Sequence, residues 1–269
     1  MTCLYPKQFG CWKTGNLIVP CGKCIVCREN RIKDWYVRMV SELTYCDYAY
    51  TATLTYDDDH LPPGEELLII DVQKFFKRLR RNLQNWKLKY YYAGEYGEKG
   101  GRPHYHAVIY FYKANDSKED VFIKETIDKC WDRGNVYLDL VSKQSVRYVL
   151  DYLQKDYYRW KEKKKVEPFQ RMSNGIGLRY MLENESRISD VAYIKVGSTK
   201  FRVPKYYRRK SELINAALNE KNNERLTNDD LSEEESYQRY KDRLNGITAK
   251  AEQVERNIKQ RKKIKRGTL

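Results

Sequence analysis

Residues 87–112 constrain the fold of this chain more strongly than any other segment. Residues 87–95 and 104–112 are rich in aromatic and aliphatic side chains, and glycines gather between them at positions 94, 97, 100 and 101. Two strand-like runs joined by a glycine-rich turn of about eight residues predict an antiparallel hairpin. The sheet that contains this hairpin is therefore expected to be antiparallel.

Further helices and strands are predicted on both sides of the hairpin. In chain order the elements are a strand at residues 50–56, a helix at 71–84, the hairpin strands at 87–95 and 104–112, a helix at 118–131, a strand at 135–140 and a helix at 145–157. Asp71 is expected to cap the first of these helices. The order β-α-β-β-α-β-α predicts an α+β fold, with a central antiparallel sheet and helices on one face.

The remaining sequence is expected to extend this core at both ends. Residues 1–48 form a Cys-containing N-terminal extension that ends in an amphipathic helix at 24–43. The core spans residues 49–160, and residues 161–204 complete it, with one more hairpin expected within 187–203. Residues 205–269 form a charged helical tail, which is expected to be partly disordered until it binds a partner.

The chain carries a large excess of positive charge. It has 52 Lys and Arg against 37 Asp and Glu, a formal net charge of +15. A basic chain gains affinity for nucleic acid because each neutralised phosphate releases counterions. The 24 tyrosines can also stack on unpaired bases, a contact worth about 1–3 kcal/mol per base. Charge and aromatic content together indicate a nucleic-acid partner.

The sequence contains no signal for a membrane or for secretion. No apolar run approaches the ~20 residues that cross a bilayer, and residues 1–10 lack the apolar segment of a secretory signal. We therefore expect a protein that acts inside a cell, without a membrane partner. In a reducing compartment its seven cysteines are expected to be thiols or metal ligands rather than disulfides.

Three cysteines have the spacing of a metal site. Cys21, Cys24 and Cys27 form a CxxCxxC pattern, and Cys3 or Cys11 could supply a fourth ligand. Four thiolates around one ion are typical of a structural Zn²⁺ site. The alternative is a group of reduced thiols around the start of a helix.

A histidine pair marks the candidate catalytic strand. His104 and His106 are two residues apart, so both side chains leave the same face of a strand. Glu95, at the end of the preceding strand, could lie beside them across the hairpin. Two histidines and one carboxylate with open positions suit Mn²⁺ or Mg²⁺ bound together with phosphate oxygens. The alternative is a pair of histidines on a half-exposed strand that bind nothing.

The predicted helix at residues 145–157 carries the candidate nucleophiles. Tyr148 and Tyr152 are four residues apart and Lys155 follows three later, so all three share one helical face. A phenol ionises near pH ~10 in water, and a metal that polarises a phosphate, with a nearby ammonium, would help it attack. The alternative is an amphipathic helix with buried aromatics.

Five motifs in this order resemble those of the HUH endonucleases, and more narrowly of the replication initiators of microviruses of the gokushovirus type. The similarity covers about residues 1–205. The motifs are CGKCIVCR at residues 21–28, TLTYDDDHLP at 53–62, GEYG at 94–97 with RPHYH at 102–106, YVLDYLQK at 148–155 and RMSNGIG at 171–177.

The resemblance implies an HUH/RRM-like core and a rolling-circle replication initiator that acts in the cytoplasm of a bacterial host. Such proteins nick single-stranded DNA at the origin, form a 5′-phosphotyrosine, free a 3′-hydroxyl and later rejoin the strand. The chain has no Walker-type phosphate loop, so a host helicase is an expected partner. The oligomeric state and the origin sequence stay open.

This sequence departs from the family pattern at two positions. The family often has Tyr-x-x-Lys-Tyr-x-x-Lys, and here Asp151 occupies the first lysine position. Tyr152 keeps its lysine, Lys155, so we expect Tyr152 to be the primary nucleophile and Tyr148 the second or a positioning residue. The hydrophobic position between the two histidines is filled by Tyr105.

Basic side chains near these motifs are the expected contacts with DNA phosphates. They are Arg78, Arg80, Arg81, Arg102 and Arg147. Two other functions stay open on sequence grounds. One is a different HUH enzyme, a single-strand transposase or a relaxase, although relaxases usually have three histidines in the metal motif. The other is a zinc-stabilised, non-enzymatic DNA-binding regulator.

Overall fold

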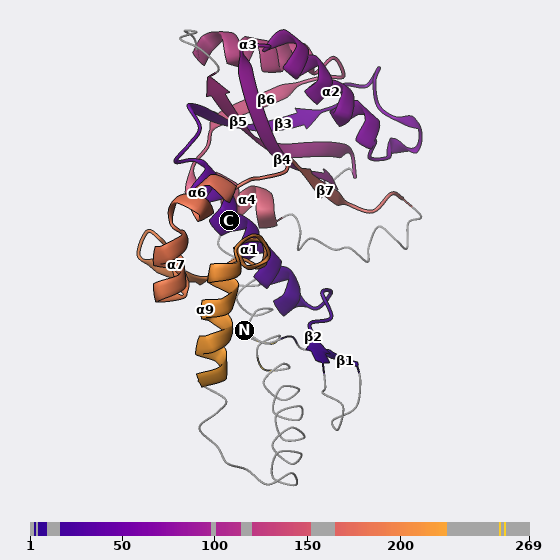
Figure 1. The fold of residues 1–269 in the computed structure, drawn as a ribbon. Coiled ribbons are helices and arrows are strands. Elements are labelled where there is room, and N and C mark those ends of the chain that lie inside the picture. The colour runs from indigo at the N-terminus through magenta and orange to yellow at the C-terminus, as the bar shows by residue number, and fades with distance from the viewer. Residues whose placement is uncertain are drawn as a thin grey trace. The chain divides into compact units, whose positions relative to one another are not determined.

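A five-stranded antiparallel sheet forms the centre of the fold (Figure 1). The structure, a computed structural model, describes residues 3, 5–9, 17–97, 101–113, 120–151, 165–224, 253 and 256. The strands are β3 (Tyr48–Thr55), β4 (Trp86–Tyr96), β5 (Pro103–Lys113), β6 (Val136–Leu140) and β7 (Phe169–Met172). Their order across the sheet is β6-β3-β5-β4-β7, and every neighbouring pair is antiparallel. β5 is thus the middle strand.

The predicted order of elements in the core is confirmed. After β3 come α2 (Ile69–Asn82), the β4–β5 hairpin, α3 (Asp120–Cys130), β6 and α4, which runs from Lys143 and is described to Asp151. The α+β class and the antiparallel sheet are therefore as expected. A short 3₁₀ turn, η1 (Pro63–Glu65), precedes α2.

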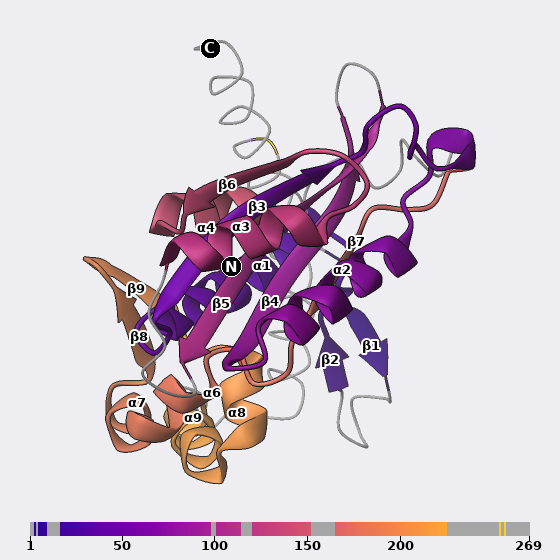
Figure 2. The same ribbon diagram turned by 90° about the horizontal axis from the view of Figure 1, so that it is seen from above.

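One face of the sheet packs against α2 and α3 (Figure 2). Because side chains alternate along a strand, β5 presents Tyr105, Ala107, Ile109 and Phe111 to this core, and all four are fully buried. The helices contribute apolar side chains at helical spacing, namely Val72, Phe75, Phe76 and Leu79 from α2 with Ile123 and Ile127 from α3. The expectation that Ala107, Ile109 and Phe111 pack into the core is confirmed.

The expectation that helices lie on one face holds for α2 and α3 but not for the whole fold. The second half of α1 (Ile25–Glu42) packs on the other face, where the Tyr110 hydroxyl donates to the Met39 carbonyl at 3.1 Å. Lys89 of β4 pairs with the buried Glu42 at 2.6 Å. Polar and aromatic residues that look solvent-facing in the sequence are thus covered by α1.

The role predicted for Asp71 is wrong. α2 begins at Ile69, and its N-cap, Leu68, makes no side-chain capping bond. Asp71 is buried and accepts a hydrogen bond from the Tyr56 hydroxyl at 3.0 Å. A buried carboxylate needs hydrogen-bond partners, and this one has a long-range partner that local sequence does not reveal.

The chain divides into two compact units. We call residues 34–214 the sheet unit, and residues 1–33 with 215–269 the terminal unit. Beyond the sheet, the described elements are β1 (Lys7–Phe9), β2 (Leu17–Val19), α6 (Leu178–Glu183), α7 (Glu185–Val191), β8 (Tyr193–Val196), β9 (Thr199–Arg202), α8 (Lys205–Lys210) and α9 (Glu212–Glu224). The hairpin expected within residues 187–203 is formed by β8 and β9, but its first part belongs to α7.

Within the described ranges, no helix is both long enough and apolar enough to cross a membrane.

Candidate functional site

The β4–β5 register brings the three predicted metal ligands to one face of the sheet. Glu95 pairs with His104, and Ala93 pairs with His106. Directly paired residues in an antiparallel sheet point to the same face, and alternate residues do too. Glu95, His104 and His106 therefore meet near the end of the hairpin, as the sequence predicts.

The ligand atoms of these three residues lie within 4.8 Å of one another. The distance from Glu95 Oε1 to His104 Nε2 is 2.9 Å, and the distance to His106 Nε2 is 3.4 Å. The two imidazole rings are nearly perpendicular, with centroids 4.9 Å apart. Glu95 and His106 are buried, and His104 is more accessible, at 17% side-chain exposure. One side of the cluster can therefore receive a ligand from solution.

The partners of the histidines suit a cation at this place. His104 Nδ1 lies 3.2 Å from the Arg102 carbonyl, which can only accept, so Nδ1 carries the hydrogen. In the neutral ring the lone pair is then on Nε2, which points at Glu95. A lone pair and a carboxylate oxygen face each other, and a cation satisfies both. His106 Nδ1 lies 3.1 Å from Thr53 Oγ1, which holds that ring in a similar way.

Tyr105, between the histidines, belongs to the core on the opposite face. Its ring is fully buried and lies over Gly94, where an added Cβ would come within 3.1 Å of two ring atoms. Its hydroxyl accepts from the Leu68 N–H at 2.8 Å and donates to the Leu68 carbonyl at 2.9 Å. Burial raises the pKa of this phenol to about 12. Tyr105 is therefore a structural anchor of β5 and not a candidate nucleophile.

Replacing Tyr105 with Phe should destabilise the protein while leaving the core packed. The Leu68 backbone groups at the start of α2 would lose their partner, at a cost of about 1–3 kcal/mol. We expect a lower midpoint of urea unfolding with an unchanged m-value. Tyr137→Phe, at a tyrosine that is 64% exposed on β6, is the control. Equal midpoints for the two variants would contradict the anchoring role.

Helix α4 places Tyr148 beside the histidines. Its buried side is formed by Val146, Val149 and Leu150, so the predicted docking of Val149 and Leu150 is confirmed. The Tyr148 ring makes a T-shaped contact with the His106 ring, at a centroid distance of 5.8 Å, and remains 58% exposed. A tyrosine that is both accessible and next to the ligand cluster is in a position to meet a substrate there.

Three predicted residues, from the same helical segment and from the N-terminal extension, lie outside the described residues. They are Tyr152, Lys155 and Cys11. The order in which the two tyrosines act therefore stays a prediction from the sequence.

The predicted DNA-contacting arginines of α2 lie away from this cluster. α2 covers the face opposite to the histidines, so Arg78, Arg80 and Arg81 do not border the site. The Arg78 Nε donates to the Cys130 carbonyl at 2.9 Å and its Nη2 pairs with Asp132 at 2.5 Å. Arg78 thus links α2 to the end of α3.

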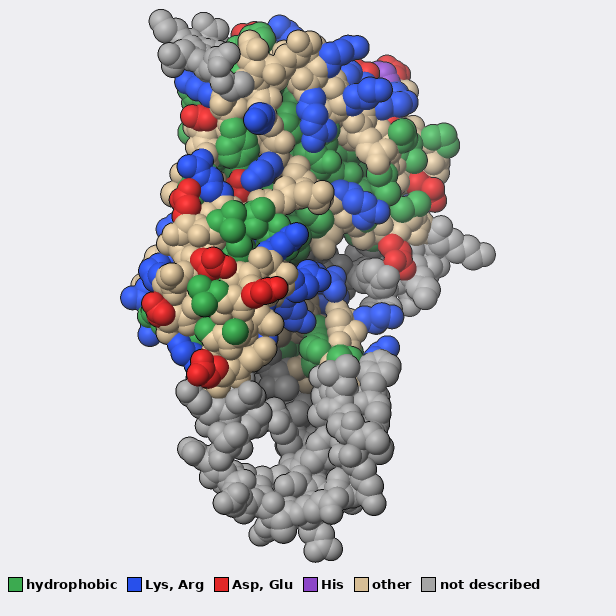
Figure 3. All heavy atoms as spheres, in the orientation of Figure 1, with side chains coloured by type: hydrophobic (Ala, Val, Ile, Leu, Met, Phe, Trp, Pro, Cys, Tyr) green, Lys and Arg blue, Asp and Glu red, His purple; other side chains and the backbone are tan. Residues whose placement is uncertain are grey.

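Arg102 and Arg147 are the predicted arginines nearest the site in the fold. Arg102 pairs with Asp58 at 2.7 Å and donates to the Tyr56 carbonyl at 3.0 Å. Arg147 is on α4 and pairs with Asp151 at 2.9 Å. Lys and Arg side chains are also spread over the face drawn in Figure 3, as a net charge of +15 requires.

One residue of the site was not predicted from sequence. Thr53 of β3 pairs with His106 across the sheet and contacts its Nδ1. The TLTYDDDHLP segment stood out as a motif, but a motif does not say which strand its members will face. The pairing of β3 with β5 supplies that information.

The four cysteines nearest each other in space, among the described residues, form a second cluster in the terminal unit. They are Cys3, Cys21, Cys24 and Cys27.

Comparison with known proteins relates the chain to viral replication. The model of a family described as "Replication-associated protein ORF2" matches residues 49–157. The replication-associated protein ORF2 of Spiroplasma virus 4 is 32% identical over 222 residues, which are 73% of this chain and 68% of that protein. The replication-associated protein VP4 of Bdellovibrio phage phiMH2K is 33% identical over 184 residues, 58% of each chain.

A third relative is the replication-associated protein ORF4 of Chlamydia phage 1, which is 32% identical over 155 residues, 52% of this chain and 38% of that protein. No solved structure matches significantly. The matched range of the family model contains the whole histidine cluster and Tyr148, and the Spiroplasma virus protein is covered over two thirds of its length. The chain therefore belongs to the family of the replication-associated protein ORF2, with relatives among the microviruses.

Proposed function

We propose that this replication-associated protein initiates rolling-circle replication by nicking single-stranded DNA with a tyrosine. The observation that carries the proposal is the meeting of Glu95, His104 and His106 within 4.8 Å, with the accessible ring of Tyr148 in contact with His106. A metal-binding cluster and an adjacent phenol are the two parts that this reaction needs.

Glu95, His104 and His106 would hold Mn²⁺ or Mg²⁺. Nitrogen and carboxylate donors on one side, with the other side open, leave room for phosphate oxygens. When bound, the ion polarises the scissile phosphate and orients it for in-line attack. Thr53 and the Arg102 carbonyl fix the ring orientations of the two histidines, so the donor atoms are set before DNA arrives.

The tyrosine supplies the nucleophile. Its phenolic oxygen forms a bond to phosphorus while the bond from phosphorus to O3′ breaks, and the phenolic proton is transferred to O3′. The products are a 5′-phosphotyrosine and a free 3′-hydroxyl that can prime synthesis. The ester keeps the energy of the phosphodiester, so the reverse attack by a 3′-hydroxyl rejoins the strand. From the sequence pattern Tyr152, with Lys155, acts first and Tyr148 second.

The relatives favour replication over the other uses of this chemistry. All three are named replication-associated proteins, and none is named a transposase or a relaxase. The chain would act on the phage origin together with the host replication machinery, including a helicase. Its positive charge supports binding to the DNA backbone.

A cleavage assay tests the proposed function. Labelled single-stranded oligonucleotides that tile the parent genome are incubated with the protein and Mn²⁺ or Mg²⁺. We expect cleavage at one origin sequence, a protein–DNA adduct that survives denaturation, and loss of both with EDTA. DNA binding without cleavage or adduct on any oligonucleotide would instead favour a non-enzymatic regulator.

Thr53→Val should weaken metal binding without removing a ligand. The variant keeps the side-chain shape but loses the hydroxyl that orients His106. Loss of such an outer partner typically weakens metal affinity by about 10–100-fold, which Mn²⁺ titration followed by electron paramagnetic resonance measures. Thr51→Val is the matched control, because Thr51 Oγ1 bonds the Asp139 carbonyl instead. Equal Mn²⁺ affinity in both variants would contradict the orienting role of Thr53.

A further inference from the structure

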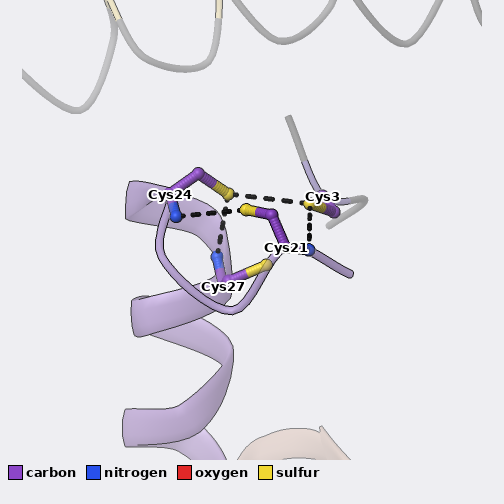
Figure 4. Close-up of side chains that lie close together, drawn as sticks. All are labelled: Cys3, Cys21, Cys24 and Cys27. Carbon is purple, nitrogen blue, oxygen red and sulfur yellow. Dashed lines mark hydrogen bonds between the residues drawn. The ribbon is translucent and has the colours of Figure 1, made fainter. Parts of the chain in front are cut away.

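The cysteine cluster of the terminal unit does not belong to the histidine site. Cys3 lies just before β1, Cys21 just after β2, Cys24 immediately before α1, and Cys27 in the first turn of α1. Figure 4 shows their four side chains converging on a common region between the loop and the helix. Three segments of the chain thus deliver sulfur atoms to one place.

The distances between the sulfur atoms fit one tetrahedral ion. All four lie within 4.8 Å of one another, and the Sγ atoms of Cys3 and Cys24 are 3.9 Å apart. Four sulfurs at about 2.3 Å from a central Zn²⁺ are separated by about 3.8 Å. The same separation is far beyond the disulfide bond length of about 2.05 Å, and all four are free thiols.

The backbone around the cluster donates to the sulfur atoms. The N–H of Cys21 points to Cys3 Sγ at 3.1 Å, that of Cys24 to Cys21 Sγ at 3.3 Å, and that of Cys27 to Cys24 Sγ at 3.4 Å. Gly22 makes this turn possible with a left-handed φ of +75°. N–H donors and a helix N-terminus both stabilise thiolates, which are the form that binds a metal.

Burial of thiols alone is a weak explanation for the cluster. Its buried members are Cys3, Cys24 and Cys27 with a single aliphatic residue, Val26. The β1–β2 ladder in the same unit has only two strands, and a two-stranded ribbon is marginally stable in water. Small units with so little apolar core usually need a disulfide or a metal.

We infer that Cys3, Cys21, Cys24 and Cys27 bind a structural Zn²⁺ ion that ties the ends of the β1–β2 hairpin to the start of α1. The four thiols release their protons when the ion binds, which leaves a tetrathiolate with a net charge of −2. Cys3, and not Cys11, is the fourth ligand. The close spacing favours one ion over an iron–sulfur cluster, which would hold its cysteines farther apart. The site acts on folding and is independent of DNA cleavage.

Metal analysis of the full-length protein tests this inference. The protein is purified without a metal-binding tag in the H104A/H106A background, so that the histidine site does not contribute, and zinc is measured by mass spectrometry. We expect a single zinc ion per chain, retained in C11S and in C46S and lost in C24S. Protein that contains no zinc, or iron in its place, would overturn the inference.

Cobalt substitution identifies the ligands even if a variant folds poorly. Co²⁺ bound to four thiolates gives intense visible bands, and replacing one sulfur with oxygen shifts and weakens them. Co²⁺-loaded wild type and C11S should share the four-thiolate spectrum, whereas C3S should show the three-thiolate spectrum or no Co²⁺ uptake. An unchanged spectrum in C3S together with a changed one in C11S would overturn the assignment of Cys3.

Discussion

His106→Ala and His104→Ala should each abolish metal-dependent cleavage of single-stranded DNA. Each substitution leaves two donors where three meet within 4.8 Å, so the ion is held weakly and out of position. Metal stabilisation of a phosphoryl transition state is worth several kcal/mol, or roughly 10³-fold in rate. The rate of oligonucleotide cleavage at saturating Mn²⁺ measures this loss, and Mn²⁺ binding should fall in parallel.

Two further variants make this prediction specific. His60→Ala removes the third histidine of the chain, which is exposed and bonds Asp57 at 2.8 Å, and it should bind Mn²⁺ like the wild type. Glu95→Gln keeps the side-chain shape while removing its charge, and it should lose Mn²⁺ affinity. If both histidine variants fold and still cleave DNA with the wild-type metal requirement, then the ion is bound elsewhere.

Y148F/Y152F should form no covalent adduct with DNA. The substitution to Phe removes the nucleophilic oxygen but keeps the ring, and therefore the contact between residue 148 and His106. Denaturing gels with end-labelled oligonucleotides detect the adduct. Binding of the same oligonucleotide should remain close to that of the wild type, because ring stacking and backbone contacts are preserved. Tyr137→Phe, at an exposed tyrosine of β6, is the control.

The single variants decide the order of attack. We expect Y152F to lose the adduct and Y148F to keep it, because Lys155 accompanies Tyr152 and Asp151 stands where Tyr148 would have its lysine. Adducts that survive only in Y152F would reverse this assignment. Adducts that survive in the double variant would contradict the proposed tyrosine chemistry altogether.

The elements of the core and the face of the histidines were predictable because they depend on local patterns. Alternation along residues 104–112 separates His104 and His106 from Ala107, Ile109 and Phe111, whichever strands lie beside them. Glu95 was predictable because a hairpin brings its own two strands together. The order of helices and strands follows from the change between helical and strand periodicity along the chain.

Features that depend on distant partners were not predictable. Tyr110 and Lys89 look like solvent-facing residues, yet α1 covers them with Met39 and Glu42. Asp71 looks like a helix cap, but its partner is Tyr56, whose place depends on the packing of β3. The choice between Cys3 and Cys11 for the cysteine cluster likewise depends on the path of the chain through β1 and β2.

The position of the ligands on two adjacent strands has a consequence for how the protein folds. A slip of β4 by one residue against β5 would turn every β4 side chain to the other face, so Glu95 would leave the histidines and enter the core. The aromatic face would then lose Tyr92 to the surface at the same time. Divalent cations bind only the correct pairing, and they therefore favour it by mass action. The candidate site thus also selects the strand alignment on which it depends.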